Sequence, residues 1–256
     1  MNPWTAEASA AGARWQAPPS ALTLAGDEVH VWRASLECPP ARLAELADLV
    51  SEDEQIRANR FRFERDRNRF IAGRGTLRVL LGRYLGIDPG ALQFRYSAAG
   101  KPALAWELDL AFNVTHSNAL ALYAVSRSEV GVDVEQVREI NDAEEIANRF
   151  FTSGERAELD AVPRARRMEG FLRAWTRKEA CLKACGLGIA AAMNRCEVPP
   201  HDEAASLKGG AGNVLESCEW WLHDLTPAPG YLAAVASRGA TRKLSCFDPE
   251  RRRQSE

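Results

Sequence analysis

The sequence lacks any apolar run of the roughly twenty residues that a membrane-spanning helix needs. It also lacks, near its N-terminus, a basic segment followed by an apolar core, so we expect no secretory signal and a cytoplasmic protein without a membrane partner. Its net charge at pH 7 is only −2. Because no overall positive charge attracts nucleic acid, we expect no nucleic-acid partner either.

Paired short cysteine spacings are absent as well. The six cysteines form no CxxC pair, and only Cys181 and Cys185 lie one helical turn apart. Zinc sites usually need such pairs, so we interpret the cysteines as reduced, mostly buried thiols. The apolar share of 46% is ample for a packed core, and 256 residues suffice for one large domain or two small ones.

Alternating and periodic segments predict an α+β fold. Each half of the chain contains strands, a charged helix and a closing hairpin, which predicts two similar α/β halves with pseudo-two-fold symmetry and an active site at their interface. Residues near the N-terminus are rich in alanine, proline and serine; either Trp4 and Trp15 attach this segment to the body, or it is flexible. We expect an N-terminal arm at 1–26, an N-terminal half at 27–127, a C-terminal half at 128–250 and a tail at 251–256.

Two acidic segments predict a metal site. Residues 131–135 (GVDVE) have the pattern of a strand, in which Asp133 and Glu135 point to one face. Residues 175–183 have the pattern of a helix that places Glu179 one turn before Lys183. If strand and helix pack together, three carboxylates converge and repel one another unless a divalent cation binds them, and oxygen ligands with room for water favour Mg²⁺. The simpler alternative is a surface ion pair between Glu179 and Lys183, worth roughly 0.2–0.5 kcal/mol.

The most basic segment, residues 55–83, has two interpretations. It is either a helix pair with a solvated basic face or an anion-binding face, since guanidinium groups suit phosphate. A second polar cluster surrounds His116 at the end of an expected strand at 111–117, where it is either structural or ligand-binding. Glu155 follows Thr152 in a helix start, for which N-capping is a sufficient explanation. The arginines concerned are Arg57, Arg60, Arg65, Arg69, Arg74 and Arg78.

Several segments, in order along the chain, resemble motifs of the 4′-phosphopantetheinyl transferases of the long, surfactin-synthetase-activating (Sfp) type. Residues 131–135 resemble its G-I/V-D-I/V-E motif, and residues 171–183 its F-x-x-x-W-x-x-K-E-x-x-x-K motif. Shorter likenesses are residues 100–102 (G-K-P), 112–117 (F-N-x-S-H-S, with Thr115 in place of the usual serine) and 149–155 (R-F-F-x-x-x-E).

The resemblance implies a monomer of two fused halves that transfers the 4′-phosphopantetheine arm of coenzyme A to a serine hydroxyl of an apo acyl-, peptidyl- or aryl-carrier protein. Adenosine 3′,5′-bisphosphate is released. The N-terminal half would bind the coenzyme A nucleotide, and the C-terminal half would hold the catalytic residues and Mg²⁺, with Mn²⁺ as an alternative ion.

The resemblance also implies roles for individual residues. Asp133, Glu135 and Glu179 would bind the metal, Glu179 would accept the serine proton with Glu155 as the alternative base, and Lys183 would stabilise or protonate the pyrophosphate oxygen. The 3′-phosphate would lie against His116 and one arginine. The residues expected to contact coenzyme A are Arg57 (with Arg60 and Arg69 as alternatives), Gly100, Lys101, Pro102, Asn113, Thr115, His116, Asp133, Lys178 and Lys183.

Two other functions remain open from the sequence. A Mg²⁺-dependent nucleotide phosphohydrolase would use the same carboxylates but would release bisphosphate without a carrier protein. A non-enzymatic phosphate-binding module would use only the basic face and would leave Asp133, Glu135 and Glu179 without a role.

Overall fold

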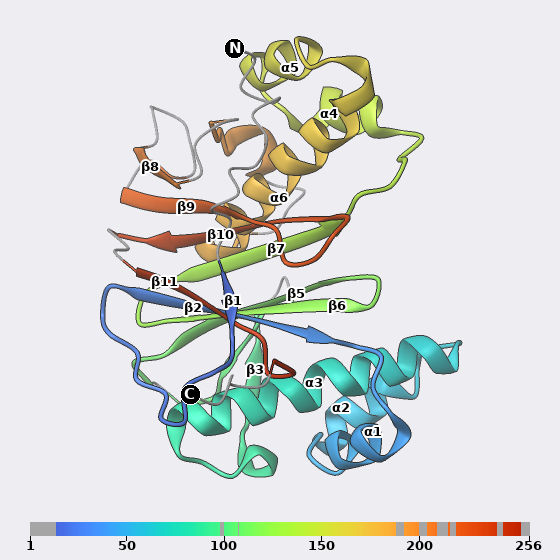
Figure 1. Ribbon diagram of the computed structural model, residues 1–256, viewed down its shortest axis with the longest axis vertical. Coiled ribbons are helices and arrows are strands. Elements are labelled where there is room, and N and C mark those ends of the chain that lie inside the picture. Colours follow the sequence, from blue (N-terminus) through green and yellow to red (C-terminus); the bar gives the residue numbers. More distant parts are fainter. Residues whose placement is uncertain are drawn as a thin grey trace.

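The computed structural model describes residues 14–97, 100–106, 108–187, 192–199, 204–208, 215, 219–239 and 243–251. Two β-sheets face each other, and a long helix covers the outer face of each (Figure 1). This arrangement confirms the predicted α+β class. Within the described residues, no helix is both long and apolar enough to cross a membrane.

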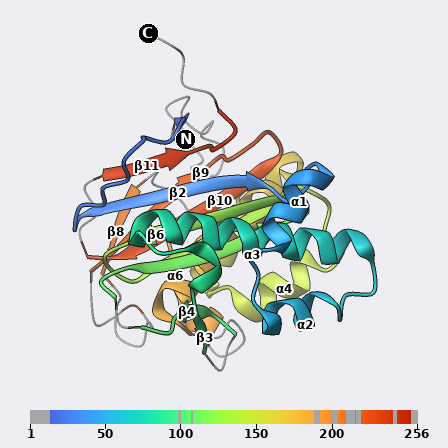
Figure 2. The ribbon, with the colours of Figure 1, turned by 90° about the horizontal axis from the view of Figure 1, so that it is seen from below.

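The first sheet has the spatial order β1, β11, β2, β6, β5. Helix α3 (Glu64–Leu85) lies across its outer face, beside the short helices α1 and α2 (Figure 2). A capping box between Ser51 and Glu54 starts α2. The strands are β1 (Trp15–Gln16), β2 (Glu28–Ser35), β5 (Ala111–Ser117), β6 (Leu120–Ser126) and β11 (Lys243–Phe247); the helices are α1 (Pro40–Ala47) and α2 (Glu52–Ala58), with the 3₁₀ turn η2 (Pro89–Ala91) and the hairpin β3 (Phe94–Tyr96) and β4 (Pro102–Leu104).

The second sheet has the spatial order β7, β10, β9, β8. Helix α6 (Arg167–Cys185) packs on β7 and β10 and ends at Gly186, which adopts the left-handed conformation typical of a C-terminal cap. The other elements are β7 (Val130–Gln136), β8 (Ala204–Lys208), β9 (Glu219–Leu225), β10 (Tyr231–Arg238), α4 (Ala143–Phe150), α5 (Ser153–Asp160), η3 (Arg164–Arg166) and η4 (Met193–Arg195).

Side-chain alternation divides the core into layers. On β7, Val132 and Val134 are buried between the two sheets, whereas Gly131 and Asp133, at the alternate positions, face α6. On β2, Val31 lies in the same inter-sheet layer, and Trp32 packs on the opposite side against the α3 layer. This period-two pattern, readable in the sequence, therefore decides which residues of β7 reach α6.

The chain order departs from the expected division at β11, and at Trp15 it agrees with one of the two alternatives for the N-terminal arm. Strand β11 pairs in parallel with β2 and so belongs to the first sheet, although we expected it to lie with the C-terminal half. Trp15 forms β1 beside β11, and its indole nitrogen donates to the Thr226 carbonyl, so this part of the arm is attached to the body. Trp4, Cys218 and the tail beyond residue 251 lie outside the described residues.

Candidate active site

The two sheets meet along their edge strands β5 and β7, where side chains of β5 bind β7. Residues at alternate positions on β5 supply these bonds, as the period-two geometry of a strand requires. The seam they form joins the two halves of the chain directly. Asn113 Oδ1 accepts from the Val132 amide (2.9 Å), Thr115 Oγ1 donates to Asp133 Oδ1 (2.9 Å), and Ser117 Oγ donates to Glu135 Oε2 (3.0 Å).

Gly131 allows helix α6 to lie directly on β7. A Cβ atom at this position would lie 2.1 Å from the Ala180 carbonyl oxygen and 2.4 Å from the Ala184 amide nitrogen. No larger residue fits such an approach of backbone to backbone. The glycine therefore sets the depth at which the carboxylates of β7 meet the side chains of α6.

Lys183 joins two carboxylates, one from each of these elements. Its ammonium nitrogen lies 2.5 Å from Asp133 Oδ1, 3.3 Å from Glu179 Oε2 and 3.3 Å from the Thr115 hydroxyl. Asp133 is only 3% exposed, and its Oδ2 has no hydrogen-bond partner among the described residues. One lysine thus serves two buried acids and leaves one oxygen unsatisfied.

The electrostatics of this cluster favour an additional positive charge. Burial, followed by the charge of Asp133, raises the pKa of Glu179 to about 7. Burial and Asp133 also raise the pKa of Glu135. Burial alone would lower the pKa of Lys183, but Asp133 and Glu179 outweigh it, so that pKa is raised. The cluster therefore holds a firmly charged lysine and two glutamates, Glu135 and Glu179, that resist ionisation.

No group of three histidine, cysteine or acidic side chains is arranged to hold a metal ion within the part of the chain that the structure describes. Lys183 instead lies between Asp133 and Glu179. The donor chemistry nevertheless fits a hard cation. Only carboxylates are involved, Asp133 Oδ2 is buried without a partner, and the acids repel one another.

A pocket of about 460 Å³ opens beside this cluster, between α3 and the end of β5. Arg57, Arg69, Arg74 and His116 bring cationic or hydrogen-bonding groups to it. Burial, followed by the charges of Lys183, Arg69 and Arg74, lowers the pKa of His116, whose imidazole thus connects the pocket with the cluster. The remaining lining residues are Leu36, Phe61, Asp66, Phe70, Gly73, Leu77, Gly100, Pro102, Val114, Asn118, Ala121 and Tyr123.

Arg74 is a pocket residue that motif comparison missed. Its Nη1 and the Nε of Arg69 are buried without a hydrogen-bond partner among the described residues. The guanidinium of Arg74 lies over the rings of Phe70 and Tyr96, at 5.6 Å and 5.5 Å. The signal in the sequence was its position one helical turn after Phe70, on the face that carries Leu77.

Two residues assigned to catalysis or coenzyme A in the sequence are instead paired with each other. Lys178 is fully buried and bonds both oxygens of Glu155, at 2.9 Å and 2.7 Å, and the Cys196 carbonyl. Glu155 also forms the capping box with Thr152, and its Oε1 accepts a hydrogen bond from the Val198 amide. Lys178 is thus closed off from a ligand and Glu155 has no free oxygen, so we withdraw both assignments.

Other expected coenzyme A contacts also have structural partners. The seam bonds occupy the side chains of Asn113 and Thr115, which are buried outside the pocket lining. Lys101 donates to the carbonyls of Val130 and Lys183, at the C-terminal end of α6, where a cation is favoured.

The arginines of the basic segment include both predicted kinds, solvated and pocket-lining, and a third kind that is buried in an ion pair. Arg57 and Arg69 line the pocket, whereas Arg60 is exposed and does not. Arg78 is buried against Glu54, 2.7 Å away, and donates to two backbone carbonyls. Arg65 is exposed and pairs with Asp66.

Two family models match this chain, one in each half, and their descriptions name the same family. The family model described as 4′-phosphopantetheinyl transferase superfamily matches residues 129–236, and the one described as 4′-phosphopantetheinyl transferase, N-terminal, matches residues 32–128. The 4′-phosphopantetheinyl transferase AcpT of Escherichia coli is 41% identical over 121 residues, which are 47% of this chain and 58% of that protein. Sfp of Bacillus subtilis is 27% identical over 154 residues, covering 60% of this chain and 68% of Sfp.

A further relative covers nearly the whole chain. The 4′-phosphopantetheinyl transferase HetI of Nostoc sp. is 43% identical over 230 residues, which are 88% of this chain and 94% of HetI. Both halves, and therefore both sides of the β5–β7 seam, lie within this match. The chain belongs to the 4′-phosphopantetheinyl transferase superfamily.

Proposed function

We propose that the Asp133–Glu179–Lys183 cluster and the adjoining arginine pocket are the active site at which this chain transfers 4′-phosphopantetheine from coenzyme A to a carrier protein. Family membership gives the reaction: the chain is a 4′-phosphopantetheinyl transferase. The observation that carries the site is a carboxylate cluster with an unsatisfied oxygen on Asp133, next to a pocket in which one buried nitrogen each of Arg69 and Arg74 has no hydrogen-bond partner among the described residues. Because both sides of the seam come from one chain, we propose that the monomer is active.

The pocket is suited to the nucleotide end of coenzyme A. Arg57, Arg69 and Arg74 would bind its phosphate groups, since guanidinium groups donate two parallel bonds to phosphate. His116 would donate one further bond at the side nearest Lys183. Gly100 and Pro102 also line the pocket and would contact the nucleotide.

The cluster is suited to the pyrophosphate. Asp133, Glu135 and Glu179 would hold Mg²⁺, or Mn²⁺, which when bound neutralises charge on the pyrophosphate and its leaving group. Lys183 would stabilise or protonate the pyrophosphate oxygen that departs. Glu179 would accept the proton of the carrier serine, as a carboxylate held beside Lys183.

In this reaction the serine oxygen forms a bond to the phosphorus that carries the pantetheine arm. The bond from that phosphorus to the bridging oxygen breaks, and adenosine 3′,5′-bisphosphate leaves with the electron pair. Glu179 takes the serine proton, and Lys183 supplies positive charge to the leaving oxygen. One phosphorus–oxygen bond is therefore formed and one is broken, and the proton that serine loses is accepted by Glu179.

The intact mass of an apo acyl- or peptidyl-carrier protein, incubated with coenzyme A and Mg²⁺, tests this proposal. We expect a gain of one phosphopantetheine group that EDTA abolishes and that Glu179→Gln slows about a thousandfold. Glu169→Gln is the matched control, because Glu169 lies on the same helix and, among the residues that the structure describes, forms an ion pair only with Arg166. Release of bisphosphate without modification of any carrier would instead support the phosphohydrolase.

A further inference from the structure

The connection between α2 and α3 exposes a basic and aromatic surface. Residues 59–65 (NRFRFER), here called the elbow, are all exposed. Phe61 and Phe63 are 41% and 58% exposed, and the elbow carries three arginines against one glutamate. Exposed aromatic side chains grouped in this way are unusual on a surface that contacts only water.

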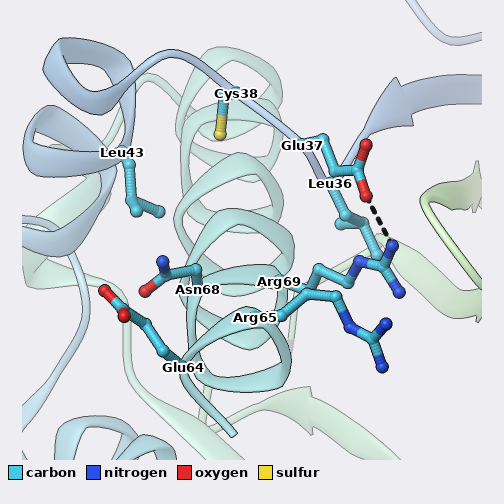
Figure 3. A pocket seen from close by; sticks show the side chains of 8 residues that line it. All are labelled: Leu36, Glu37, Cys38, Leu43, Glu64, Arg65, Asn68 and Arg69. Atoms are coloured by element: carbon cyan, nitrogen blue, oxygen red, sulfur yellow. Dashed lines mark hydrogen bonds and ion pairs between the residues drawn. The ribbon is translucent and has the colours of Figure 1, made fainter.

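The elbow continues into a groove of about 340 Å³ between α3 and the segment that follows β2 (Figure 3). Leu36, Cys38 and Leu43 give the groove an apolar side, and the first turns of α3 contribute Glu64, Arg65, Asn68 and Arg69. On one side Arg69 is held by Glu37, with 2.5 Å between Nη2 and Oε1. The elbow and the groove thus form one continuous surface, which is net basic at the elbow and has an apolar recess lined by two acids and two arginines.

This surface lies on the same side of the molecule as the reacting groups. Phe61 lines the nucleotide pocket together with Asn118, which follows β5 and donates to Gln136 at the end of β7. In Figure 1 the start of α3, the β5–β6 turn and the end of β7 all lie at the right-hand side of the molecule. A protein that presents a serine to the cluster at this edge therefore approaches the elbow.

Two of the three arginines of the elbow are not neutralised by an acidic side chain among the described residues. Arg60 and Arg62 do not line the nucleotide pocket, and neither forms an ion pair among the described residues. Arg62 lies over the ring of Phe63, at 5.4 Å. Exposed cations without partners favour an anionic surface and raise its rate of association.

We propose that the elbow and the adjoining groove dock the carrier protein, through an acidic face and one apolar side chain that enters the groove. This inference rests on the proposed function, because it assigns the partner of the same reaction. The arginines orient the acidic face, and the apolar contact with Phe63 and Leu43 supplies the desolvated centre that stable docking needs.

The test is the steady-state kinetics of Arg60→Glu/Arg62→Glu with an apo carrier protein. We expect the KM for the carrier to rise tenfold or more, while the KM for coenzyme A and the kcat at saturating carrier stay within twofold. Phe63→Ser should raise the carrier KM by a smaller factor. The matched control is Arg149→Glu/Arg164→Glu, which makes the same charge change at exposed positions of the C-terminal half.

Three results would overturn the docking surface: an unchanged carrier KM, an equal rise in the control, or a rise confined to the KM for coenzyme A. An unchanged carrier KM accompanied by weaker binding of single-stranded RNA would assign the elbow to nucleic acid instead. If the wild-type chain modifies no carrier, the proposed function itself fails, so the two failures are distinguishable.

Discussion

Helix α6 carries two lysines that bind carboxylates, and the two groups differ in how many of the carboxylate oxygens have hydrogen-bond partners. Lys178 binds Glu155 in full burial, and the two Glu155 oxygens receive four bonds, from the lysine, the Thr152 amide and the Val198 amide. Lys183 must serve both Asp133 and Glu179, and Asp133 Oδ2 receives none from the described residues. The saturated group holds the fold, and the unsatisfied group is available for chemistry.

The helical repeat explains why one motif contains both groups. Residues five positions apart on a helix point about 140° apart at 3.6 residues per turn. Lys178 therefore faces Glu155 and η4, while Lys183 faces β7 with Glu179 one turn before it. A comparison of the two lysines separates residues that support the fold from residues that act on a substrate.

The largest effect on activity is expected when the Asp133–Glu179–Lys183 cluster loses the carboxylate of Glu179. Glu179→Gln should lower kcat about a thousandfold, because proton transfer by a positioned side chain contributes about 10²–10⁴. The melting temperature should stay the same or rise, since a buried and repelled carboxylate is removed. Activity within tenfold of wild type, measured by carrier mass, would contradict the assignment.

For the Lys178–Glu155 pair, we expect substitution to lower the stability of the fold. Lys178→Met leaves Glu155 as an unpaired buried charge, which costs about 3–5 kcal/mol in the free energy of unfolding. Lys178→Met/Glu155→Met should recover much of this loss in urea titrations. A stable double variant that transfers nothing would show that this pair acts in catalysis after all.

A change at the contact between strand and helix should affect both properties moderately. Gly131→Ala forces β7 from α6, at about 1–3 kcal/mol for overpacking, and should also lower kcat by displacing Asp133 from Glu179. Gly154→Ala is the control, because a Cβ there meets only ordinary contacts at 3.6 Å and beyond. Equal melting temperatures for the two variants would argue against the close approach.

The smallest effect is expected from the ion itself. Mg²⁺ at ten times its Kd should stabilise the folded chain by about 1.4 kcal/mol, which is about 3–5 °C in melting temperature for a chain of this size. Glu179→Gln should reduce this shift, and Glu169→Gln should keep it. If neither Mg²⁺ nor EDTA changes the melting temperature of the wild-type protein, the proposed metal site is wrong.

Much of the fold could be predicted because its signals are local. The alternation in residues 130–134 and the capping boxes at Ser51 and Thr152 depend on near neighbours, and the structure has all three. The burial of Lys178 also had a local signal, since Phe171, Ala174 and Cys181 on the same helical face are apolar. That pattern outweighs the motif, which does not show which of its lysines reaches a ligand.

The seam between the halves could not be predicted in the same way. Asn113 and Thr115 bind positions 18 or 19 residues later in the chain, and no periodicity within either segment indicates that pairing. Their polar side chains suggested a ligand because the sequence does not show that the edge of a second sheet lies opposite. The parallel pairing of β11 with β2 was missed for the same reason.

The position of β11 has a consequence for how the molecule is assembled. Since β11 lies between β1 and β2, the first sheet receives an inner strand only after nearly the whole chain has been synthesised. Its Cys246 and Phe247 fill cores on both faces of that sheet. The first half therefore leaves the ribosome with an unfilled gap between two strands, and such long-range pairing is slow to form. We expect the two halves to fold as one cooperative unit, and a polypeptide that stops after β6 to aggregate.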